Sequence, residues 1–238
     1  MSDEQLRPAS TVVLVRDTER GMETLMLKRN KALVFAGGLW VFPGGSLDAE
    51  DLDAAGGDQH EAARIAAARE AEEEAGLRPL LDEMVLLSHW TTPREESRRF
   101  ATWIWAAPLE ADDEVVIDGG EIHDSRWMPV SEAVAAHAAG EMGMLPPTFV
   151  TLCTLAHYAS VEEMVAAERT SPVPEVFPVL ASEDDSLVVL FRGDAGYDTG
   201  DPQAGGARHR AIMRNGAWDY VYTDVDSAFP PLIRGAGG

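Results

Sequence analysis

The segment 61–75 constrains the fold of this chain more than any other part of the sequence. Apart from one Ile it contains only Ala, Arg and Glu, and it has no Gly or Pro. These three residue types are strong helix formers, and Gly76 follows at the position where helices commonly end. The sequence therefore predicts one long helix, Glu61–Ala75, with a defined carboxyl end.

Four glutamates lie near the end of this predicted helix. Residues three and four positions apart share one face of a helix, so Glu70, Glu73 and Glu74 converge, and Glu72 points away from them. Three carboxylates on one face repel each other unless a cation lies among them. Oxygen ligands suit hard ions, so the pattern indicates a Mg²⁺ or Mn²⁺ site, in which Arg69 orients Glu73. A solvated helix with ordinary surface acids is the alternative interpretation.

A tight turn precedes the acidic helix. The apolar run 39–42 predicts a strand, and Pro43-Gly44-Gly45 stops it. Such a turn places backbone amides beside the carboxylates, an arrangement suited to binding phosphate together with metal ions. The segment 46–60 is acidic and contains glycine, and we expect a loop there. The turn favours a metal site over an ordinary surface helix.

Apolar and β-branched runs predict the other elements. A hairpin is expected from 11–15 and 23–29, and Asn215-Gly216 is the strongest two-residue signal for another. The other predicted strands are 84–91, 98–107, 121–128, 186–192, 208–214 and 217–223, and the other predicted helices are 130–139, 146–158 and 161–168.

The chain is long enough for one sizeable core with an appendage. The change of character after the predicted helices indicates a core domain over 8–160 and a β-rich C-terminal extension over 161–238 that packs on it. Two roles are open for the extension, namely formation of a homodimer and capping of the substrate.

Charge and cysteine content narrow the class of protein. Acidic residues outnumber basic ones, 41 to 19, for a formal net charge of −22, so we expect no nucleic-acid partner. No run of 18 apolar residues occurs and Met1–Glu4 does not resemble a secretory signal, so we expect no membrane segment. Cys153 is the single cysteine, and its apolar neighbours favour a buried thiol over a nucleophile. These features together predict a cytoplasmic protein.

The segment from Glu61 to Leu77 resembles the signature of the Nudix family of pyrophosphohydrolases. That signature runs Gly, five residues, Glu, seven residues, Arg-Glu, an apolar residue, any residue, Glu-Glu, any residue, Gly and an apolar residue. Glu61 and everything after it match, whereas 15 residues separate Glu61 from Gly45. We interpret 46–60 as carrying a ten-residue insertion.

The resemblance implies an α/β fold, the Nudix α/β/α sandwich, in which a mixed central sheet lies between helices and the helix 61–75 covers one face. It also implies metal-assisted hydrolysis of a diphosphate bond, with Mg²⁺ or Mn²⁺ as cofactor and a nucleoside diphosphate linked to another group as substrate. The implied roles are catalysis and metal ligation by Glu70, Glu73, Glu74 and Glu121, metal contact by Gly45, and structural roles in the box for Glu61, Arg69 and Gly76.

Several residues beyond the box are candidates for substrate contact. Arginine suits phosphate oxygens, and Arg29, Arg98 and Arg99 are basic residues in an acidic chain. With the turn residues Gly44 and Gly45 they form the predicted substrate-binding set, although a strand from Arg98 also turns alternate residues to solvent. Glu121 is the acid expected from outside the box, and Glu114 is its competitor.

Other segments are similar to the branch of peroxisomal coenzyme A diphosphatase-like Nudix proteins, which also have an interrupted box. They are 90–93, 98–102 and 119–122, followed by Trp127. Leu25–Arg29 and Gly38 resemble the ends of that branch's coenzyme A motif, but apolar residues at 32–35 replace its middle arginine. Three functions stay open: hydrolysis of coenzyme A or acyl-coenzyme A, hydrolysis of ADP-ribose, dinucleotides or NADH, and ligand sensing without turnover.

Overall fold

A computed structural model describes residues 6–32, 36–110, 114–117 and 119–234. The expected features at Met1–Glu4 and at 33–35 lie wholly or largely outside these residues. The chain begins with the predicted hairpin: β1 (Arg7–Thr18) and β2 (Gly21–Arg29) run antiparallel, with Val15 opposite Thr24. The β-branched run at its centre is buried, as its composition predicted.

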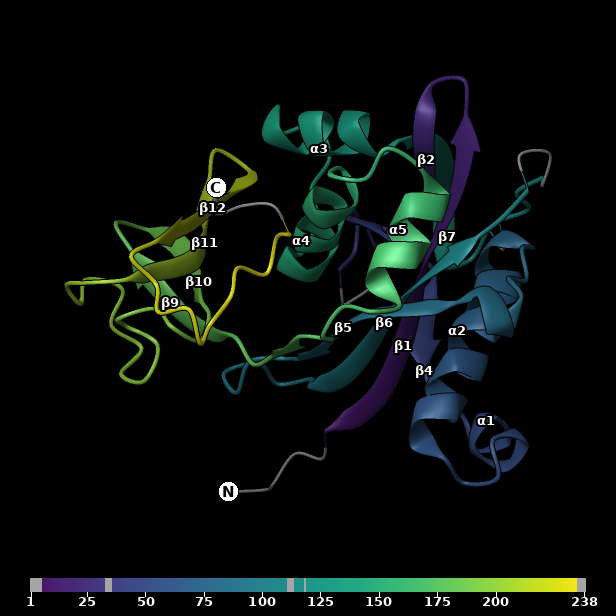
Figure 1. Cartoon of the computed structure of the whole chain (residues 1–238), viewed down its shortest axis with the longest axis horizontal. Coiled ribbons are helices and arrows are strands. Elements are labelled where there is room, and N and C mark those ends of the chain that lie inside the picture. Colours follow the sequence, from purple (N-terminus) through teal and green to yellow (C-terminus); the bar gives the residue numbers. More distant parts are fainter. Residues whose placement is uncertain (1–5, 33–35, 111–113, 118, 235–238) are drawn as a thin grey trace.

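The hairpin belongs to a mixed central sheet (Figure 1). Its strands follow the order β3-β2-β1-β6-β5-β8, while β4 pairs with β1 and β7 pairs with β2. The β1–β6 and β5–β8 pairs are parallel and the others are antiparallel. The remaining strands are β3 (Trp40–Val41), β4 (Gly44–Ser46), β5 (Val85–Thr91), β6 (Phe100–Pro108), β7 (Ile122–Pro129) and β8 (Glu175–Val176).

One face of this sheet is covered by α2 (Gln59–Ala75), the predicted alanine-rich helix. Asp58 caps its start by accepting a hydrogen bond from the Glu61 backbone N–H, and Gly76 ends it with a left-handed φ of 70°. Its buried alanines lie against Leu14, Leu25 and other apolar residues of β1, β2 and β6. Because alanine is small, the helix axis comes close to the sheet and brings the glutamates of its last turns near the strands.

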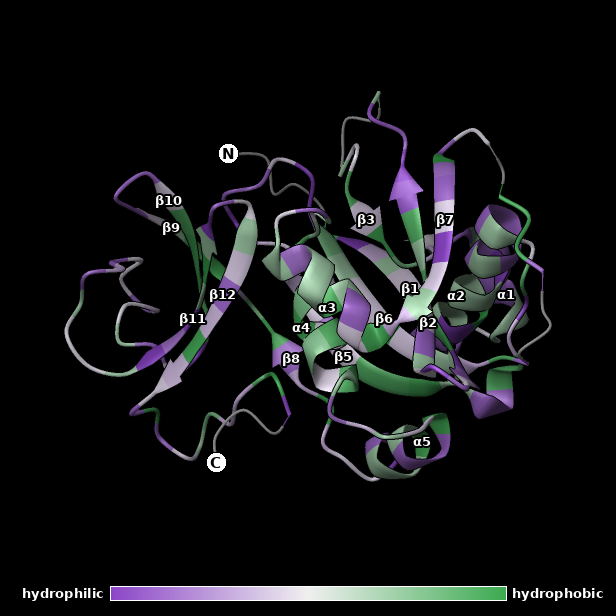
Figure 2. Ribbon diagram, turned by 90° about the horizontal axis from the view of Figure 1, so that it is seen from above, coloured by the Kyte–Doolittle hydropathy of each residue, from purple (hydrophilic) through white to green (hydrophobic). Residues whose placement is uncertain are grey.

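The other face carries α3 (Val130–Ala138), α4 (Pro146–Leu155) and α5 (Val161–Glu168). Apolar residues, green in Figure 2, gather in the central strands and in α4. A single hydrophobic cluster joins these helices to β1, β2, β5 and β6. The sheet therefore lies between two helical layers, as predicted. No helix in the described part of the chain has the length and apolarity needed to cross a bilayer.

A second, four-stranded antiparallel sheet follows, in the order β12-β11-β10-β9. Its strands are β9 (Val179–Glu183), β10 (Ser186–Leu190), β11 (Arg208–Arg214) and β12 (Ala217–Thr223). Trp218 attaches this sheet to the helical layer: its backbone N–H donates to His137 Nε2 (2.8 Å) and its indole N–H to the Met144 carbonyl (2.9 Å). Phe191 and Ile233 extend the main hydrophobic cluster into this region.

The prediction of a loop over 46–60 is wrong in part. A short helix, α1 (Ala49–Ala54), forms inside it, and β4 occupies its first residue. Asp48 and Asp51 form a capping box, in which Asp51 accepts a hydrogen bond from the Asp48 backbone N–H (2.9 Å). Strands β8 and β9 and the 3-10 turn Leu81–Glu83 were also not predicted. All three are short, and β8 also depends on a partner distant in sequence, β5.

Candidate active site

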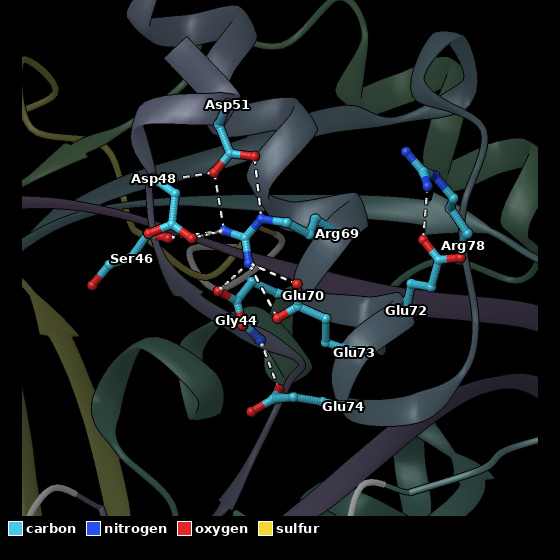
Figure 3. Close-up of polar contacts among 10 residues, drawn as sticks. All are labelled: Gly44, Ser46, Asp48, Asp51, Arg69, Glu70, Glu72, Glu73, Glu74 and Arg78. Atoms are coloured by element: carbon cyan, nitrogen blue, oxygen red, sulfur yellow. Dashed lines mark hydrogen bonds and ion pairs between the residues drawn. The ribbon is translucent and has the colours of Figure 1, made fainter. Parts of the chain in front are cut away.

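Arg69 of α2 is the centre of a group of carboxylates (Figure 3). Its Nη2 and Nε donate to Asp51 (2.9 and 3.2 Å), and its Nη1 donates to Glu70 (2.9 Å) and Glu73 (3.2 Å). Hydrogen bonding to Asp51, followed by Glu70 and Glu73, raises the pKa of Arg69, although burial opposes the effect. One guanidinium therefore holds α1 and two of the predicted metal ligands in a fixed relationship.

Asp51 has the most enclosed carboxylate of this group, with a residue exposure of 3%. It reaches Arg69 from the inserted helix α1, while the backbone carbonyl of Ser46 accepts a further Arg69 hydrogen bond (3.1 Å). A buried carboxylate needs a charged or hydrogen-bonding partner, and Asp51 has both in Arg69 and the Asp48 backbone. The contact ties the insertion to the glutamate helix.

Glu74, one turn of α2 beyond Glu70, points toward the glycine turn (Figure 3). Its Oε2 accepts a hydrogen bond from the Gly44 backbone N–H (3.0 Å). Burial raises the pKa of Glu74 to about 8, with a smaller upward contribution from Glu70, and the bond from Gly44 offsets part of the shift. Burial likewise raises the pKa of Glu70, against the opposing effect of Arg69. Both carboxylates would gain stabilisation from a nearby cation.

The two glycines of the turn are required by close packing. A Cβ at Gly44 would lie 2.5 Å from the Ser10 carbonyl oxygen and 2.6 Å from Thr11. A Cβ at Gly45 would overlap the carboxylate of Glu70. The missing side chains thus create the space in which Glu70 faces the backbone of the turn.

Arg29, at the end of β2, joins Glu74 to Glu121. Its Nη1 lies 3.8 Å from Glu74 and its Nη2 lies 2.9 Å from Glu121. The Arg29 side chain is 17% exposed, and its Nε has no hydrogen-bond partner among the described residues. Glu121, predicted to join the site from outside the box, is therefore close to Glu74. Its competitor, Glu114, is exposed.

The other predicted residues are more dispersed. Glu73 is 57% exposed and pairs with Arg69, and Glu72 pairs with Arg78 (2.7 Å), away from the turn (Figure 3). Glu61 pairs with Arg64 (2.6 Å) in the first turn of α2. The predicted arginines beyond Arg29 precede β6, at the end of the sheet where β1 begins and β2 ends; these are Arg98, which is exposed, and Arg99, which donates to the Thr92 carbonyl (3.4 Å).

The donor chemistry of this site fits a hard divalent cation. Glu70 and Glu74 supply carboxylate oxygens next to the backbone of Gly45, and Glu121 lies beyond Arg29. No three donors already form a ligand cluster anywhere in the ranges 6–32, 36–110, 114–117 and 119–234. Glu70 and Glu74 would hold the ion, and the Arg69 contact leaves Glu73 at the rim of the site.

Asp51 is the residue of this site that sequence reasoning missed. A signal was present, because Asp48-Ala49-Glu50-Asp51 has the spacing of an acidic capping box. The pattern marks the start of a helix inside a segment that otherwise has the composition of a loop.

Comparison with known proteins identifies the fold and the box together. The family model described as NUDIX domain matches residues 5–146, which is more than half of the chain. The chain belongs to the NUDIX family. The predicted Nudix fold is confirmed by a NUDIX hydrolase from Alicyclobacillus acidocaldarius, whose crystal structure superposes with a TM-score of 0.63 at 21% identity, over 71% of this chain and 99% of that one.

Curated relatives point to one branch of the NUDIX family. Acyl-coenzyme A diphosphatase NUDT19 of Xenopus laevis is 27% identical over 135 residues, which is 54% of this chain and 35% of that protein. The human protein of the same name is 28% identical over 115 residues, or 46% of this chain and 31% of that protein. The matched region thus spans about a third of the length of these relatives. These matches, at 27% and 28% identity, confirm the resemblance to the coenzyme A diphosphatase-like branch.

Proposed function

We propose that this NUDIX protein hydrolyses a diphosphate bond in a nucleoside diphosphate linked to another group, with Mg²⁺ or Mn²⁺ bound at the end of α2. The observation that carries the proposal is the pair of carboxylates, Glu70 and Glu74, which one helix turns toward the glycine turn at Gly44–Gly45. Burial raises the pKa of both, so the site favours a cation or a proton between them.

Each residue would have a distinct task. A bound divalent ion would neutralise diphosphate oxygens and lower the pKa of water at the site. Glu70 and Glu74 would hold that ion beside the glycine turn, and a carboxylate of the site would accept a proton from the attacking water. Arg29 would exchange its contact with Glu121 for a phosphate oxygen, and the backbone of Gly45 would approach the substrate without obstruction by a side chain.

Acyl-coenzyme A or coenzyme A is the proposed substrate. The support is the similarity to two acyl-coenzyme A diphosphatases, together with the interrupted box. The absent middle arginine of the coenzyme A motif favours an alternative substrate of the same chemical class, such as ADP-ribose or NADH, so both are tested together.

The test is a panel of acetyl-coenzyme A, coenzyme A, ADP-ribose and NADH, each incubated with Mg²⁺ or Mn²⁺ and assayed for both products. Glu70→Gln removes a proposed ligand with little change of shape, and Glu72→Gln removes an equal charge from the same helix on its far side. We expect Glu70→Gln to lose at least 100-fold in kcat/KM and Glu72→Gln to stay within threefold. Equal activity of the two variants would reject the site.

The reaction products found in this assay identify the substrate. Cleavage of coenzyme A esters to 3′,5′-ADP and an acyl phosphopantetheine would support the proposed substrate. Cleavage of ADP-ribose or NADH alone would overturn it and leave the diphosphatase proposal standing. Tight binding of one of these compounds with no product from any of them would identify a ligand sensor instead.

A further inference from the structure

Two cationic side chains lie over the indole of Trp40, on the face of the sheet that carries α3 and α4. Lys28 Nζ is 5.3 Å and Arg126 Cζ is 4.9 Å from the centre of the Trp40 ring. Within the sheet, Lys28 of β2 has Trp40 of β3 on one side and Asp124 of β7 on the other. Arg126 follows Asp124 by two positions, so its side chain projects from the same face.

The basic pair, Lys28 and Arg126, has little compensation from acidic side chains. Arg126 pairs with Asp124 at 3.4 Å, and both side chains are exposed, at 58% and 40%. Exposed ion pairs of this kind are weak because water screens them. Lys28 has no ion pair within the part of the chain that the structure describes. Because the two like charges repel each other, an anion beside both would stabilise the arrangement.

The basic pair lies at the edge of the sheet where the proposed active site is found. Lys28 directly precedes Arg29, whose side chain lies beside Glu74 and Glu121. Arg29 therefore faces the α2 side of the sheet and Lys28 faces the other side, as neighbours on a strand commonly do. Figure 2 shows this hydrophilic end of β2 between β3 and β7. A substrate held at Glu74 thus meets a second group of cations where it passes the end of β2.

The side chains of the basic pair suit a phosphate group. The planar fork of arginine matches phosphate oxygens, and lysine adds a compact positive charge. A phosphate monoester carries a charge of about −1.5 to −2 at pH 7, which two cations can balance. In the proposed function, the diphosphate already has the metal ion and Arg29 as partners. Coenzyme A and its esters also carry a phosphate monoester on the ribose, whereas ADP-ribose and NADH carry none.

We infer that Lys28 and Arg126 form a specificity subsite for a phosphate monoester on the ribose of the substrate, and that in coenzyme A this group is the 3′-phosphate. The inference rests on the proposed function, because the diphosphate at Glu70 and Glu74 defines the other end of the bound nucleotide. Asp124 competes with the phosphate for Arg126 and so limits the affinity of the subsite. The basic pair selects the substrate and takes no part in bond cleavage.

The experiment compares substrates that differ only by this phosphate. The first pair is coenzyme A and 3′-dephospho-coenzyme A, and the second pair is NADPH, which has a 2′-phosphate, and NADH. The ratio of kcat/KM within each pair is measured with Mg²⁺ and the full-length protein. A second readout, which needs no turnover, is the Kd of 3′,5′-ADP and of AMP in EDTA, by isothermal titration calorimetry.

Lys28→Met and Arg126→Met remove one charge each and keep the apolar stem that covers Trp40. Arg78→Met is the matched control, because it removes an equal charge from an exposed side chain that pairs with Glu72. We expect the wild type to prefer coenzyme A over the dephospho form by about 10-fold or more. Lys28→Met and Arg126→Met should each lower this ratio by about fivefold through the kcat/KM of coenzyme A alone. Arg78→Met should leave the ratio unchanged.

Asp124→Asn tests the same subsite with the opposite sign. It removes the acid that competes for Arg126, so the preference for coenzyme A should rise by about two- to threefold. The Kd of AMP should be the same in all of these variants, which also shows that they are folded. A preference that falls in Asp124→Asn would contradict the competition.

The possible failures of the subsite and of the proposed function differ. Equal kcat/KM for coenzyme A and its dephospho form, with equal Kd values for 3′,5′-ADP and AMP, would overturn the subsite and leave the diphosphatase proposal intact. Discrimination in the NADPH pair alone would support the basic pair and overturn its assignment to the 3′-phosphate. Absence of turnover with every compound would reject the proposed function, whereas tighter binding of 3′,5′-ADP that is lost in Lys28→Met would still support the subsite.

Discussion

The carboxylate of Glu70 occupies the space that a side chain at Gly45 would fill. The two residues come from different elements, α2 and β4, and meet because β4 pairs with β1 beneath the helix. The first glycine of the same turn has a different neighbour, since its Cβ would meet the backbone of Ser10. Adjacent glycines therefore have separable functions.

Gly45→Ala should reduce activity far more than stability. The added methyl group meets the end of a flexible side chain, so Glu70 can move aside at small cost, and its carboxylate leaves the turn. We expect diphosphatase activity to fall at least 10-fold while the free energy of unfolding changes by less than about 1 kcal/mol. Steady-state kinetics with Mg²⁺ and urea denaturation test the two parts.

Gly44→Ala provides the contrast, because its Cβ would lie 2.5 Å from backbone that has no freedom to move. We expect a loss of about 1–3 kcal/mol in the free energy of unfolding. Gly205→Ala is the control, since nothing lies within 4 Å of its added Cβ. Equal destabilisation by the two turn variants would contradict this assignment.

Glu74 should make the metal-free protein less stable as the pH rises. Its pKa is about 8 in the folded chain, whereas the ordinary value for a glutamate is 4.5. The folded state therefore holds the proton more tightly than the unfolded chain does. Between these pH values the unfolded chain releases the proton first, and the free energy of unfolding falls by at most about 1.4 kcal/mol per pH unit. Urea denaturation of wild type and Glu74→Gln in EDTA should show a difference that grows from pH 4.5 to 8.

Glu72→Gln is the matched control for this titration, because Glu72 is a half-exposed residue of the same helix. Its stability should follow that of the wild type across the pH range. Added Mg²⁺ should restore stability to the wild type at pH 8 and have a smaller effect on Glu74→Gln. A stability difference that shrinks as the pH rises would show that the sign of the Glu74 shift is wrong.

Asp194 should be essential for the stability of the C-terminal sheet. Both of its oxygens are buried, and they accept hydrogen bonds from Arg210 (2.7 and 2.8 Å) and from the backbone of Gly196 and His209 (2.9 and 2.8 Å). Asp194→Asn leaves a buried guanidinium without its counter-charge, so we expect a loss of about 3–5 kcal/mol by denaturation. Asp219→Asn, which breaks the exposed pair with Arg214, should cost less than about 1 kcal/mol.

The single thiol should be inert in the folded protein. Burial raises the pKa of Cys153 to about 12, so little thiolate exists at pH 8. A disulfide reagent should modify it at least 100-fold more slowly in buffer than in urea, as the absorbance of the released thiol will show. Rapid modification of the native protein would mean that the α4 region opens readily.

The sequence was sufficient to predict α2 and both hairpins, because these features follow from local composition and turn signals. The layered sheet was predicted from the resemblance to the Nudix family. It did not predict α1, whose six residues gain their stability from Asp51 and its distant partner Arg69. Helix periodicity also placed Glu73 with Glu70 and Glu74. In the structure Glu73 is 57% exposed and pairs with Arg69, a contact that their spacing of four residues predicted.

The position of Glu121 illustrates the same limit. Its distance along the chain from the box gave no indication of proximity, and two acids competed for the role. The β2–β7 pairing brings Glu121 to the side of Arg29, because it places Ile122 opposite Arg29, whose side chain reaches Glu121. Pairing between strands distant in sequence therefore brings an acid from outside the box close to the residues of the box.

The contacts of Trp218 determine whether this protein can be shortened by removal of the C-terminal sheet. Its indole and backbone each bond to the α3–α4 region, and Phe191 and Ile233 share one apolar interior with β1 and β5. A variant truncated before this sheet would expose apolar residues of the remaining domain to solvent. We therefore expect that deletion of the second sheet causes the remaining chain to aggregate, instead of folding as a smaller active enzyme.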